Sequence, residues 1–325
     1  MNVLIVGGTG NISTSIVAEL LRQGHAVSVV TRGGHRDELP PEVTRIVADR
    51  RDYGAFEATM ADHAWDAVID MVAFTADDAE SAVRAFTGRT DHYVVCSTVV
   101  TYGDRFTQLP ADEDEPQTAT DAYGRGKVEM EQIVREAHAT GRLPVTIMRP
   151  SHTFGRIPII RQVTGLDTTF IDRLRLGRPI LVTDTAEDTT WMSLHVDDAA
   201  VAFVHCLGRD VCIGNVYNVV GDETYSWADY HRRIAGAIDL KAELVAAPVD
   251  VLLAAGGAQT AILGITAFDG WFSNNRIKGD VPEFAQRISF EDGMRRNVAY
   301  ADAHGLITSA QSATWEDNLI EELTR

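Results

Sequence analysis

The sequence has little lysine and little cysteine. Only three of its 29 basic residues are lysine, so arginine carries nearly all the positive charge. Cys96, Cys206 and Cys212 form no C-x-x-C pair and lie within or beside apolar runs. This arrangement argues against a disulfide framework and predicts reduced, buried thiols. Because no group of His, Cys and carboxylate residues has metal-ligand spacing, we expect no metal site.

Acidic residues outnumber basic ones, and the sequence has no long uninterrupted apolar run. Its formal net charge is −18, and such a field repels phosphate backbones, so we expect neither nucleic acid nor anionic membranes as partners. The longest apolar stretch, residues 249–268, contains Asp250 and Gln259, and we interpret it as one or two buried helical segments. Since no signal peptide pattern begins the chain, we expect a cytoplasmic protein.

What the first 150 residues do contain is a regular alternation of short apolar runs and amphipathic stretches. The apolar runs predict strands over 2–7, 26–31, 44–48, 66–72, 92–97 and 145–150. The stretches between them predict helices, for example over 14–23, 77–87 and 122–139. Near-continuous Val and Ile runs indicate strands that are buried on both faces. The pattern therefore predicts an α/β fold, a Rossmann-type parallel sheet covered by helices on both faces.

A glycine-rich loop, VGGTGNIS at 6–13, follows the first predicted strand and opens the first predicted helix. Such a loop presents backbone N–H groups and a helix N-terminus to a pyrophosphate. The dinucleotide pattern has glycine at 7, 10 and 13, and Ser13 stands at the third position, where it is small enough for close packing. The loop and its position predict dinucleotide binding.

The second predicted strand lacks the terminal carboxylate that NAD sites use for the ribose hydroxyls. Thr31 stands there and Arg32 follows, so a 2′-phosphate is not repelled and Arg32, together with Arg36, can pair with it. The sequence thus favours NADP, with NAD as the alternative, unless Arg32 is only a solvated loop charge. After the third strand, Asp49 is a candidate for the adenine amino group, with Arg50 beside it.

After residue 150 the alternation loosens. Residues 193–207 and 215–220 still have the pattern of sheet-associated elements. We therefore predict a dinucleotide-binding domain over 1–165 to which 190–221 returns. Residues 166–189 and 222–325 are predicted to form a smaller substrate-binding region, mainly from C-terminal insertions.

Tyr123 and Lys127 lie four residues apart, which places them on one face of a helix. With eight tyrosines and three lysines, chance placement predicts roughly 0.07 such pairs. No other tyrosine is followed by Lys or Arg at this spacing. An ammonium in an arginine-rich chain indicates that the position requires lysine, since the two cations are not interchangeable. The pair is a candidate for catalysis, the alternative being an ordinary pair on a helix surface.

Five segments, GGTGNIS, CSTVVTYG, YGRGK, MRPSHTFG and SLHVDDAA, occur in this order along the chain. In this they resemble the extended short-chain dehydrogenase/reductases, the group that holds nucleotide-sugar epimerases and dehydratases, over residues 1 to about 220. In that family the catalytic hydroxyl precedes the YG tyrosine by four residues and the catalytic tyrosine by about 25. Both spacings lead to Thr98.

The resemblance implies hydride transfer between a secondary alcohol and a ketone, with Tyr123 as acid/base and Thr98 as the anchor of the substrate oxygen. Lys127 would lower the pKa of Tyr123 by roughly 1–3 units and bind the nicotinamide ribose. A homodimer through the Tyr/Lys helix is also implied. The cofactor contacts that the loop and the resemblance imply are Gly7, Thr9, Gly10, Asn11, Ile12, Arg32, Asp49, Arg50, Val72, Ala73, Lys127 and Pro150.

Departures from the family pattern bear on the substrate. Val99 and Val100 replace the Asp-Glu pair of the dehydratases, which argues against elimination chemistry. His152 and Trp191 stand where epimerases usually carry Asn and Arg for a substrate diphosphate. We therefore expect Thr98, Val99, His152 and Trp191 to line a pocket for a less charged substrate, the alternative being that His152 and Trp191 are packing residues.

Three other arginines, Arg156, Arg161 and Arg276, leave a diphosphate possible. His195 is interpreted as structural, with Asp197 or Asp198 capping the following helix. The favoured function is a reductase that interconverts a secondary alcohol and a ketone on a sugar-like or polyhydroxylated metabolite. The alternative is a nucleotide-sugar epimerase that holds NAD tightly. The segments TRGGHR (31–36) and FDGWFSNNRIKGD (268–280) also resemble the chloroplast stem-loop-binding branch of the superfamily. This resemblance gives a third hypothesis, a non-catalytic RNA-binding relative.

Overall fold

A computed structural model of the chain describes residues 1–34 and 39–325; Arg36 lies outside these ranges. The described chain divides into two compact units. Unit 1 comprises Met1–Thr153, Val196–Val220 and Phe272–Gln286. Unit 2 comprises Phe154–His195, Gly221–Trp271 and Arg287–Arg325. Residues 272–286 therefore belong to unit 1, whereas the sequence analysis placed them in the substrate-binding region.

Unit 1 is built on a seven-stranded parallel sheet. In their order across the sheet, the strands are β3 (Thr44–Val47), β2 (Ala26–Thr31), β1 (Asn2–Val6), β4 (Trp65–Asp70), β5 (Thr90–Cys96), β6 (Val145–Pro150) and β13 (Val216–Val219). The order reverses between β1 and β4, and ligands of such sheets bind outside the carboxyl ends of the strands at this point.

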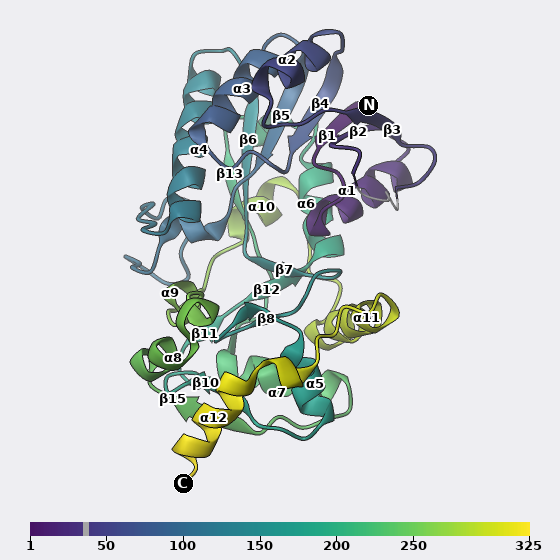
Figure 1. The fold of residues 1–325 in the computed structure, drawn as a ribbon. Helices are drawn as coiled ribbons and strands as arrows, with labels where there is room; N and C mark the ends of the chain where they lie inside the picture. The colour runs from purple at the N-terminus through teal and green to yellow at the C-terminus, as the bar shows by residue number, and fades with distance from the viewer. Residues whose placement is uncertain (35–38) are drawn as a thin grey trace. The chain divides into compact units, whose positions relative to one another are not determined.

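Helices cover both faces of this sheet (Figure 1). On one face α1 (Asn11–Arg22) packs against α6 (Val196–His205). On the other face α3 (Ala76–Phe86) lies between α2 (Tyr53–Ala61) and α4 (Ala122–Ala139). Unit 1 also contains η1 (Val99–Tyr102), η2 (Asp210–Cys212) and α10 (Asn275–Asp280), and β7 (His152–Phe154) begins in it. The predicted Rossmann-type fold is confirmed.

The central strands have apolar, buried segments because both faces of the sheet are covered. Residues Val3, Leu4 and Ile5 of β1 are fully buried, as are Val94 and Val95 of β5. The predicted strands 26–31 and 145–150 and the predicted helix 122–139 coincide with β2, β6 and α4. The first helix begins at residue 11 and not at 14; Gly10 is its N-cap, and the Gly10 N–H donates to the Ser13 hydroxyl.

Unit 2 contains short strands and helices around an aromatic core. Trp227, Tyr230 and Phe290 are buried at its centre, with ring centroids 5.1 Å apart for Trp227 and Tyr230 and 5.3 Å for Tyr230 and Phe290. Its strands are β8 (Ile160–Arg161), β9 (Gly165–Leu166), β10 (Ile180–Thr183), β11 (Thr190–Trp191), β12 (Ser193–His195), β14 (Tyr225–Ser226) and β15 (Leu244–Ala247). Its helices are α5 (Thr169–Arg175), α7 (Trp227–Ala237), α8 (Val249–Gly256), η3 (Gly257–Thr260), α9 (Leu263–Thr266), α11 (Phe290–Ala303), η4 (Ala310–Ser312) and α12 (Thr314–Leu323).

Residues 249–268 are helical as predicted, but the prediction that they are buried is wrong. They form α8, η3 and α9, and their buried positions recur every three or four residues. These buried positions are Leu252, Gly256, Thr260, Leu263 and Thr266. One side of the segment therefore faces the core of unit 2, and Leu253 and Phe268 are exposed.

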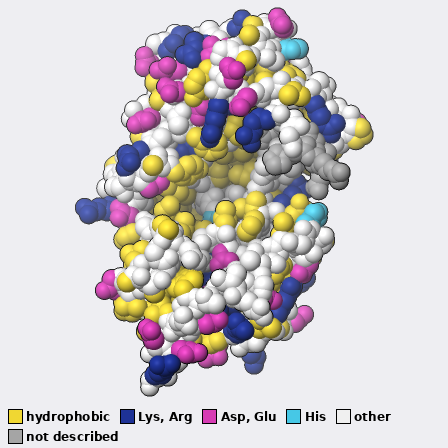
Figure 2. Space-filling model, in the orientation of Figure 1, with side chains coloured by type: hydrophobic (Ala, Val, Ile, Leu, Met, Phe, Trp, Pro, Cys, Tyr) yellow, Lys and Arg dark blue, Asp and Glu magenta, His cyan; other side chains and the backbone are white. Residues whose placement is uncertain are grey.

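No helix within residues 1–34 and 39–325 combines the length and the apolar character that a membrane span requires. The three cysteines are free and buried, which confirms that prediction. Acidic and basic side chains are interspersed on the face that Figure 2 shows, so the net negative charge does not form one continuous patch there.

Candidate functional site

A groove of about 730 Å³ lies in unit 1 at the carboxyl ends of β1, β2, β3 and β4. This is the edge at which the strand order reverses, where a doubly wound sheet binds its ligand. The groove is lined by Val6, Gly7, Thr9, Gly10, Val30, Thr31, Arg32, Gly33, Gly34, Ala48, Asp49, Arg50, Arg51, Val72, Phe74 and Asp78. Seven of the predicted cofactor contacts are therefore brought together here: Gly7, Thr9, Gly10, Arg32, Asp49, Arg50 and Val72.

The turn between β1 and α1 requires glycine at residue 7. Gly7 has a φ of +87°, and a Cβ there would lie 2.4 Å from Cγ1 of Val72. Ser13, at the third position of the pattern, is buried and accepts a hydrogen bond from the Gly10 N–H at 2.8 Å. The serine is therefore more than a tolerated small residue, because it closes the N-terminus of α1. The glycine turn and the helix N-terminus form a cradle that suits a pyrophosphate.

The end of β2 and the segment after β3 place two exposed arginines along the groove, Arg32 and Arg51. The Asp49 carboxylate accepts a hydrogen bond from the Arg51 N–H at 2.9 Å, which holds the turn after β3. Arg51 was not among the predicted contacts, although it is the second arginine of ADRRD. The two side chains make this part of the groove positive, in a protein whose net charge is negative.

Arg50, a predicted cofactor contact, is buried in the groove wall. Its guanidinium lies over the Phe56 ring, donates to the Asp78 carbonyl and lies 3.5 Å from the Asp70 carboxylate. Its Nε and Nη1 have no hydrogen-bond partner among the described residues. Two buried donors without an acceptor fit a ligand that supplies one, such as an adenine ring.

The Tyr123–Lys127 pair lies in the first turns of α4, whose N-cap Asp121 accepts from the Gly124 N–H at 2.9 Å. Lys127 is buried, and its Nζ donates to the carbonyls of Ala73 at 2.8 Å and Cys96 at 2.6 Å. These carbonyls lie at the carboxyl ends of β4 and β5. Burial lowers the pKa of Lys127, and nearby carboxylates, including Asp70, raise it.

Phe74 connects this pair to the groove. It lines the groove, its ring centroid lies 6.4 Å from that of Tyr123, and the Lys127 Nζ lies 4.5 Å from the centroid. The helix comes this close because residue 126 is glycine: a Cβ there would lie 2.7 Å from the Phe74 carbonyl oxygen.

Thr98 precedes η1, and its Oγ1 accepts from the Val100 N–H at 3.2 Å. Burial raises the pKa of Tyr123 to about 12, although 46% of the residue remains accessible, and the nearby Thr98 hydroxyl opposes this rise. The lowering of this pKa by Lys127 and the shared placement of Thr98 and Tyr123 at a substrate oxygen both stay predictions.

The remaining predicted cofactor contacts lie outside the groove. The Asn11 side chain donates to the Thr153 carbonyl at 3.1 Å, and Ile12 is partly buried on α1. Ala73 is fully buried and offers its carbonyl to Lys127, and Pro150 ends β6 beside Val219 of β13.

The residues predicted to line a substrate pocket are spread over both units. In unit 1, Val99 is buried in η1, and His152 has an Nε2 without a described partner, with its pKa lowered to about 4 by burial. In unit 2, Trp191 is only 9% exposed and stacks on Trp227 at 4.5 Å, so packing occupies most of its surface.

Two of the arginines considered for a diphosphate already have carboxylate partners. Arg161 is fully buried in unit 2 and pairs with Glu316 of α12. Arg276 in unit 1 pairs with Asp114 at 2.8 Å and with Glu113 at 3.4 Å. His195 packs edge-on against Phe154, and Asp197, in the first turn of α6, accepts from Ser15 of α1.

Three residues at the site, Asp70, Phe74 and Asp78, were not predicted from the sequence. No sequence motif identifies Asp70 or Phe74. Asp78 could have been recognised, because with Thr75 it forms a capping box at the start of α3, and its carboxylate accepts from the Phe74 and Thr75 N–H groups at 2.8 and 3.1 Å.

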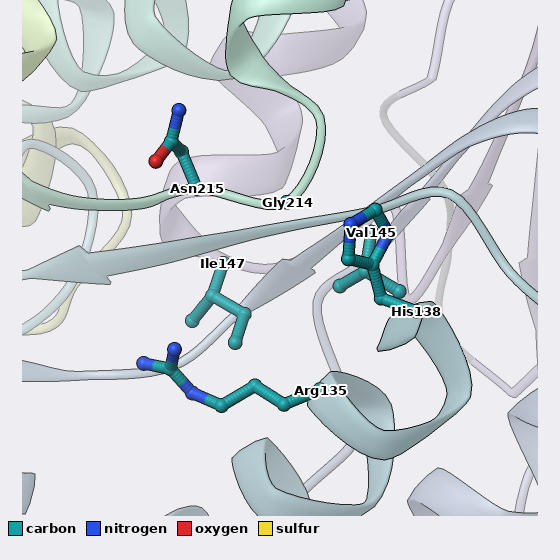
Figure 3. A pocket seen from close by; sticks show the side chains of 6 residues that line it. All are labelled: Arg135, His138, Val145, Ile147, Gly214 and Asn215. Atoms are coloured by element: carbon teal, nitrogen blue, oxygen red, sulfur yellow. The ribbon is translucent and has the colours of Figure 1, made fainter. Parts of the chain in front are cut away.

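A smaller cavity of about 220 Å³ lies at the other edge of the sheet, where β6 and β13 begin (Figure 3). Its lining includes Arg135 and His138 of α4 and Asn215. It contains none of the predicted site residues. Among the described residues, no group of three or more His, Cys, Asp or Glu side chains is placed to hold a metal ion.

Comparison with known proteins defines the class. The profile of the NAD dependent epimerase/dehydratase family matches residues 3–88 and 81–220. The chain therefore belongs to the NAD-dependent epimerase/dehydratase family of extended short-chain dehydrogenase/reductases. It is an NAD(P)-dependent enzyme of this family, as the sequence predicted.

Individual relatives are more distant. The chain is 27% identical to a 2′-dehydrokanamycin reductase of Streptomyces kanamyceticus over 77% of this chain and 70% of the relative. It is 27% identical to a UDP-glucose 4-epimerase of Lacticaseibacillus casei over 46% of this chain, and it spans only 50% of that relative. Among solved structures, a UDP-glucose 4-epimerase from Stenotrophomonas maltophila with bound NAD has the same fold, with a TM-score of 0.75, 20% identity and coverage of 95% of this chain and 100% of that one.

Proposed function

We propose that the protein is an NADP-preferring reductase that converts a ketone to a secondary alcohol on a sugar-like or other polyhydroxylated metabolite. Tyr123 is the proton donor, Thr98 holds the substrate oxygen beside it, and Lys127 binds the nicotinamide ribose. The reduced nicotinamide supplies the hydride to the carbonyl carbon.

One observation carries this proposal: the Tyr123–Lys127 pair adjoins the dinucleotide groove through Phe74. The same ring lines the groove and contacts both members of the pair. Lys127 donates two of the three N–H groups of an ammonium to carbonyls, and the third is left for a ribose hydroxyl.

The protonation state of Tyr123 is compatible with the direction of reduction. A phenol whose pKa is raised to about 12 carries its proton at neutral pH. It can therefore donate that proton to the carbonyl oxygen as the hydride reaches the carbon. The effect of the Thr98 hydroxyl on the pKa of Tyr123 supports a shared position for the substrate oxygen.

Arg32 and Arg51 support the preference for NADP. Both are exposed along the groove, beyond a β2 terminus that has no carboxylate, and two guanidinium groups suit a 2′-phosphate. A substrate without a diphosphate is supported by the pairing of Arg161 and Arg276 with carboxylates, which leaves neither guanidinium uncompensated. The similarity to a reductase named for an amino-sugar antibiotic agrees with a polyhydroxylated substrate.

The test is a fluorescence titration of NADPH and NADH against the wild type, Arg32→Ala and Arg142→Ala. Arg142 is an exposed arginine outside the groove and controls for the change in net charge. We expect NADPH to bind more tightly than NADH, Arg32→Ala to remove most of that preference and Arg142→Ala to keep it. A wild type that prefers NADH refutes the role of Arg32, and one that binds neither nucleotide refutes the enzyme proposal.

The second candidate is a nucleotide-sugar epimerase with tightly held NAD, which the similarity to UDP-glucose 4-epimerases favours. The two activities differ in cofactor use. A reductase consumes NADPH in proportion to product, and an epimerase shows no net change in absorbance and keeps NAD through purification. The family resemblance also supports a homodimer, which sedimentation of the purified protein tests.

A further inference from the structure

Glu131 lies one helical turn after Lys127 on α4 and is fully buried. Its carboxylate receives two parallel bonds from Arg149 of β6, from Nε at 2.9 Å and from Nη2 at 2.6 Å. It also accepts from the Ser97 hydroxyl at 2.5 Å and from the Gln117 amide at 3.0 Å. A buried carboxylate with this many donors is held in one position, because each lost bond leaves a buried polar group unpaired.

The partners of Glu131 belong to the elements that carry the proposed catalytic residues. Ser97 immediately precedes Thr98, and Glu131 follows Tyr123 and Lys127 by two turns and one turn on the same helix. The bond between Ser97 and Glu131 therefore ties the end of β5 to α4. It joins the backbone that carries Thr98 to the helix that carries the other two residues.

A second arm of the network holds η1. The Nη1 of Arg149 donates to the Tyr102 hydroxyl at 2.8 Å, and this hydroxyl donates to Oδ1 of Asn218 at 2.7 Å. Tyr102 is the last residue of η1, and Thr98 is its N-cap. Both ends of the short helix are thereby fixed, through Ser97 at one end and Tyr102 at the other, to a single ion pair.

We propose that Glu131 is the positioning residue of this active site, and that with Arg149 it sets the placement of Thr98 relative to Tyr123 and Lys127. This inference rests on the proposed function. It adds that the geometry at the nicotinamide end depends on a buried ion pair whose members touch neither substrate nor cofactor. Burial opposes ionisation of Glu131, but the bonds and charge of Arg149 bring its pKa below the ordinary value, so the carboxylate remains charged.

Two variants test the proposal, Glu131→Gln and Ser97→Ala. The second removes only the link to the Thr98 backbone and leaves the ion pair in place, so it tests the proposal even if Glu131→Gln fails to fold. Glu129→Gln is the matched control, because it removes the same charge from an exposed position on the same helix. The probes are NADPH, which reaches Lys127 in the proposed function, and adenosine 2′,5′-bisphosphate, which occupies only the adenine half of the groove.

We expect NADPH to bind roughly tenfold more weakly to Glu131→Gln and roughly threefold more weakly to Ser97→Ala, with binding of the bisphosphate unchanged in both. Glu129→Gln should bind both probes as the wild type does. Equal weakening of the two probes in Ser97→Ala would show a merely structural role, and unchanged binding of both would show no role; either result overturns the proposal. A wild type that binds neither probe refutes the proposed function instead.

Discussion

Replacement of Gly126 by alanine should destabilise unit 1, although alanine is the better helix former. In an exposed helix interior this substitution stabilises by about 1 kcal/mol. At residue 126 the new Cβ would lie 2.7 Å from the backbone carbonyl oxygen of Phe74, a separation that real Cβ atoms essentially never show. A backbone atom cannot rotate away, so α4 must move outward by roughly 0.5 Å or more to restore contact.

Overpacking of this kind costs about 1–3 kcal/mol, which exceeds the gain in helix propensity. We therefore expect Gly126→Ala to lower the free energy of unfolding by about 1 kcal/mol. The same shift lengthens the bonds from Lys127 Nζ to the Ala73 and Cys96 carbonyls, now 2.8 and 2.6 Å, so NADPH should also bind more weakly. The measurements are urea unfolding followed by circular dichroism and an NADPH titration.

Gly54→Ala is the matched control. Gly54 lies in α2 of the same unit, and nothing is within 4 Å of the position of its Cβ. This substitution should stabilise the protein by a few tenths of a kcal/mol up to about 1 kcal/mol and leave NADPH binding unchanged. If Gly126→Ala stabilises the protein as much as Gly54→Ala does, the close approach of α4 to Phe74 is not a constraint and the reasoning fails.

Three further predictions concern stability. Burial lowers the pKa of His92 to about 4, so protonation of this side chain favours the unfolded chain, and stability should fall between about pH 6.5 and pH 4. In urea unfolding across this range, His92→Gln should remove up to about 3 kcal/mol of that fall. An identical pH profile for the variant would contradict this prediction. Glu316→Gln leaves the buried Arg161 with only the Asp167 carboxylate, at 3.4 Å, and should destabilise unit 2 by up to about 3–5 kcal/mol. Glu187→Gln, in an exposed pair, should cost less than about 1 kcal/mol, and similar thermal shifts for both variants would contradict the prediction. Ser13→Ala removes the buried acceptor of the Gly10 N–H and should lower the free energy of unfolding by about 1 kcal/mol, whereas an unchanged urea midpoint would show that this bond is dispensable.

The sheet and its helices were predictable because the pattern that specifies them is local. Strands buried on both faces, such as β1 and β2, are mostly apolar, and α4 begins at a capping aspartate. The Tyr123–Lys127 pair was also local, four residues apart on one helix. For the same reason, the glycine loop could be placed at the carboxyl end of the first strand.

Other properties depend on partners that are distant in the sequence. The partners of the Lys127 ammonium, the carbonyls of Ala73 and Cys96, could not be predicted from the sequence of the helix, because they lie at the carboxyl ends of two different strands. The role of Glu131 was not predicted, because it depends on an ion pair with Arg149, which lies 18 residues away in the sequence. Residues 249–268 were predicted to be buried because apolar composition does not show which side of a helix packs.

The chain passes between the two units five times, at residues 153, 195, 220, 271 and 286. A protein cut after residue 153 would lose β13 and the α6 partner of α1, so the nucleotide-binding part cannot be expressed as an N-terminal fragment with its sheet complete. Neither part could have been acquired by simple end-to-end gene fusion. Insertions and deletions in unit 2 therefore fall between segments of unit 1, and the sheet of unit 1 must still form from the segments on either side of them.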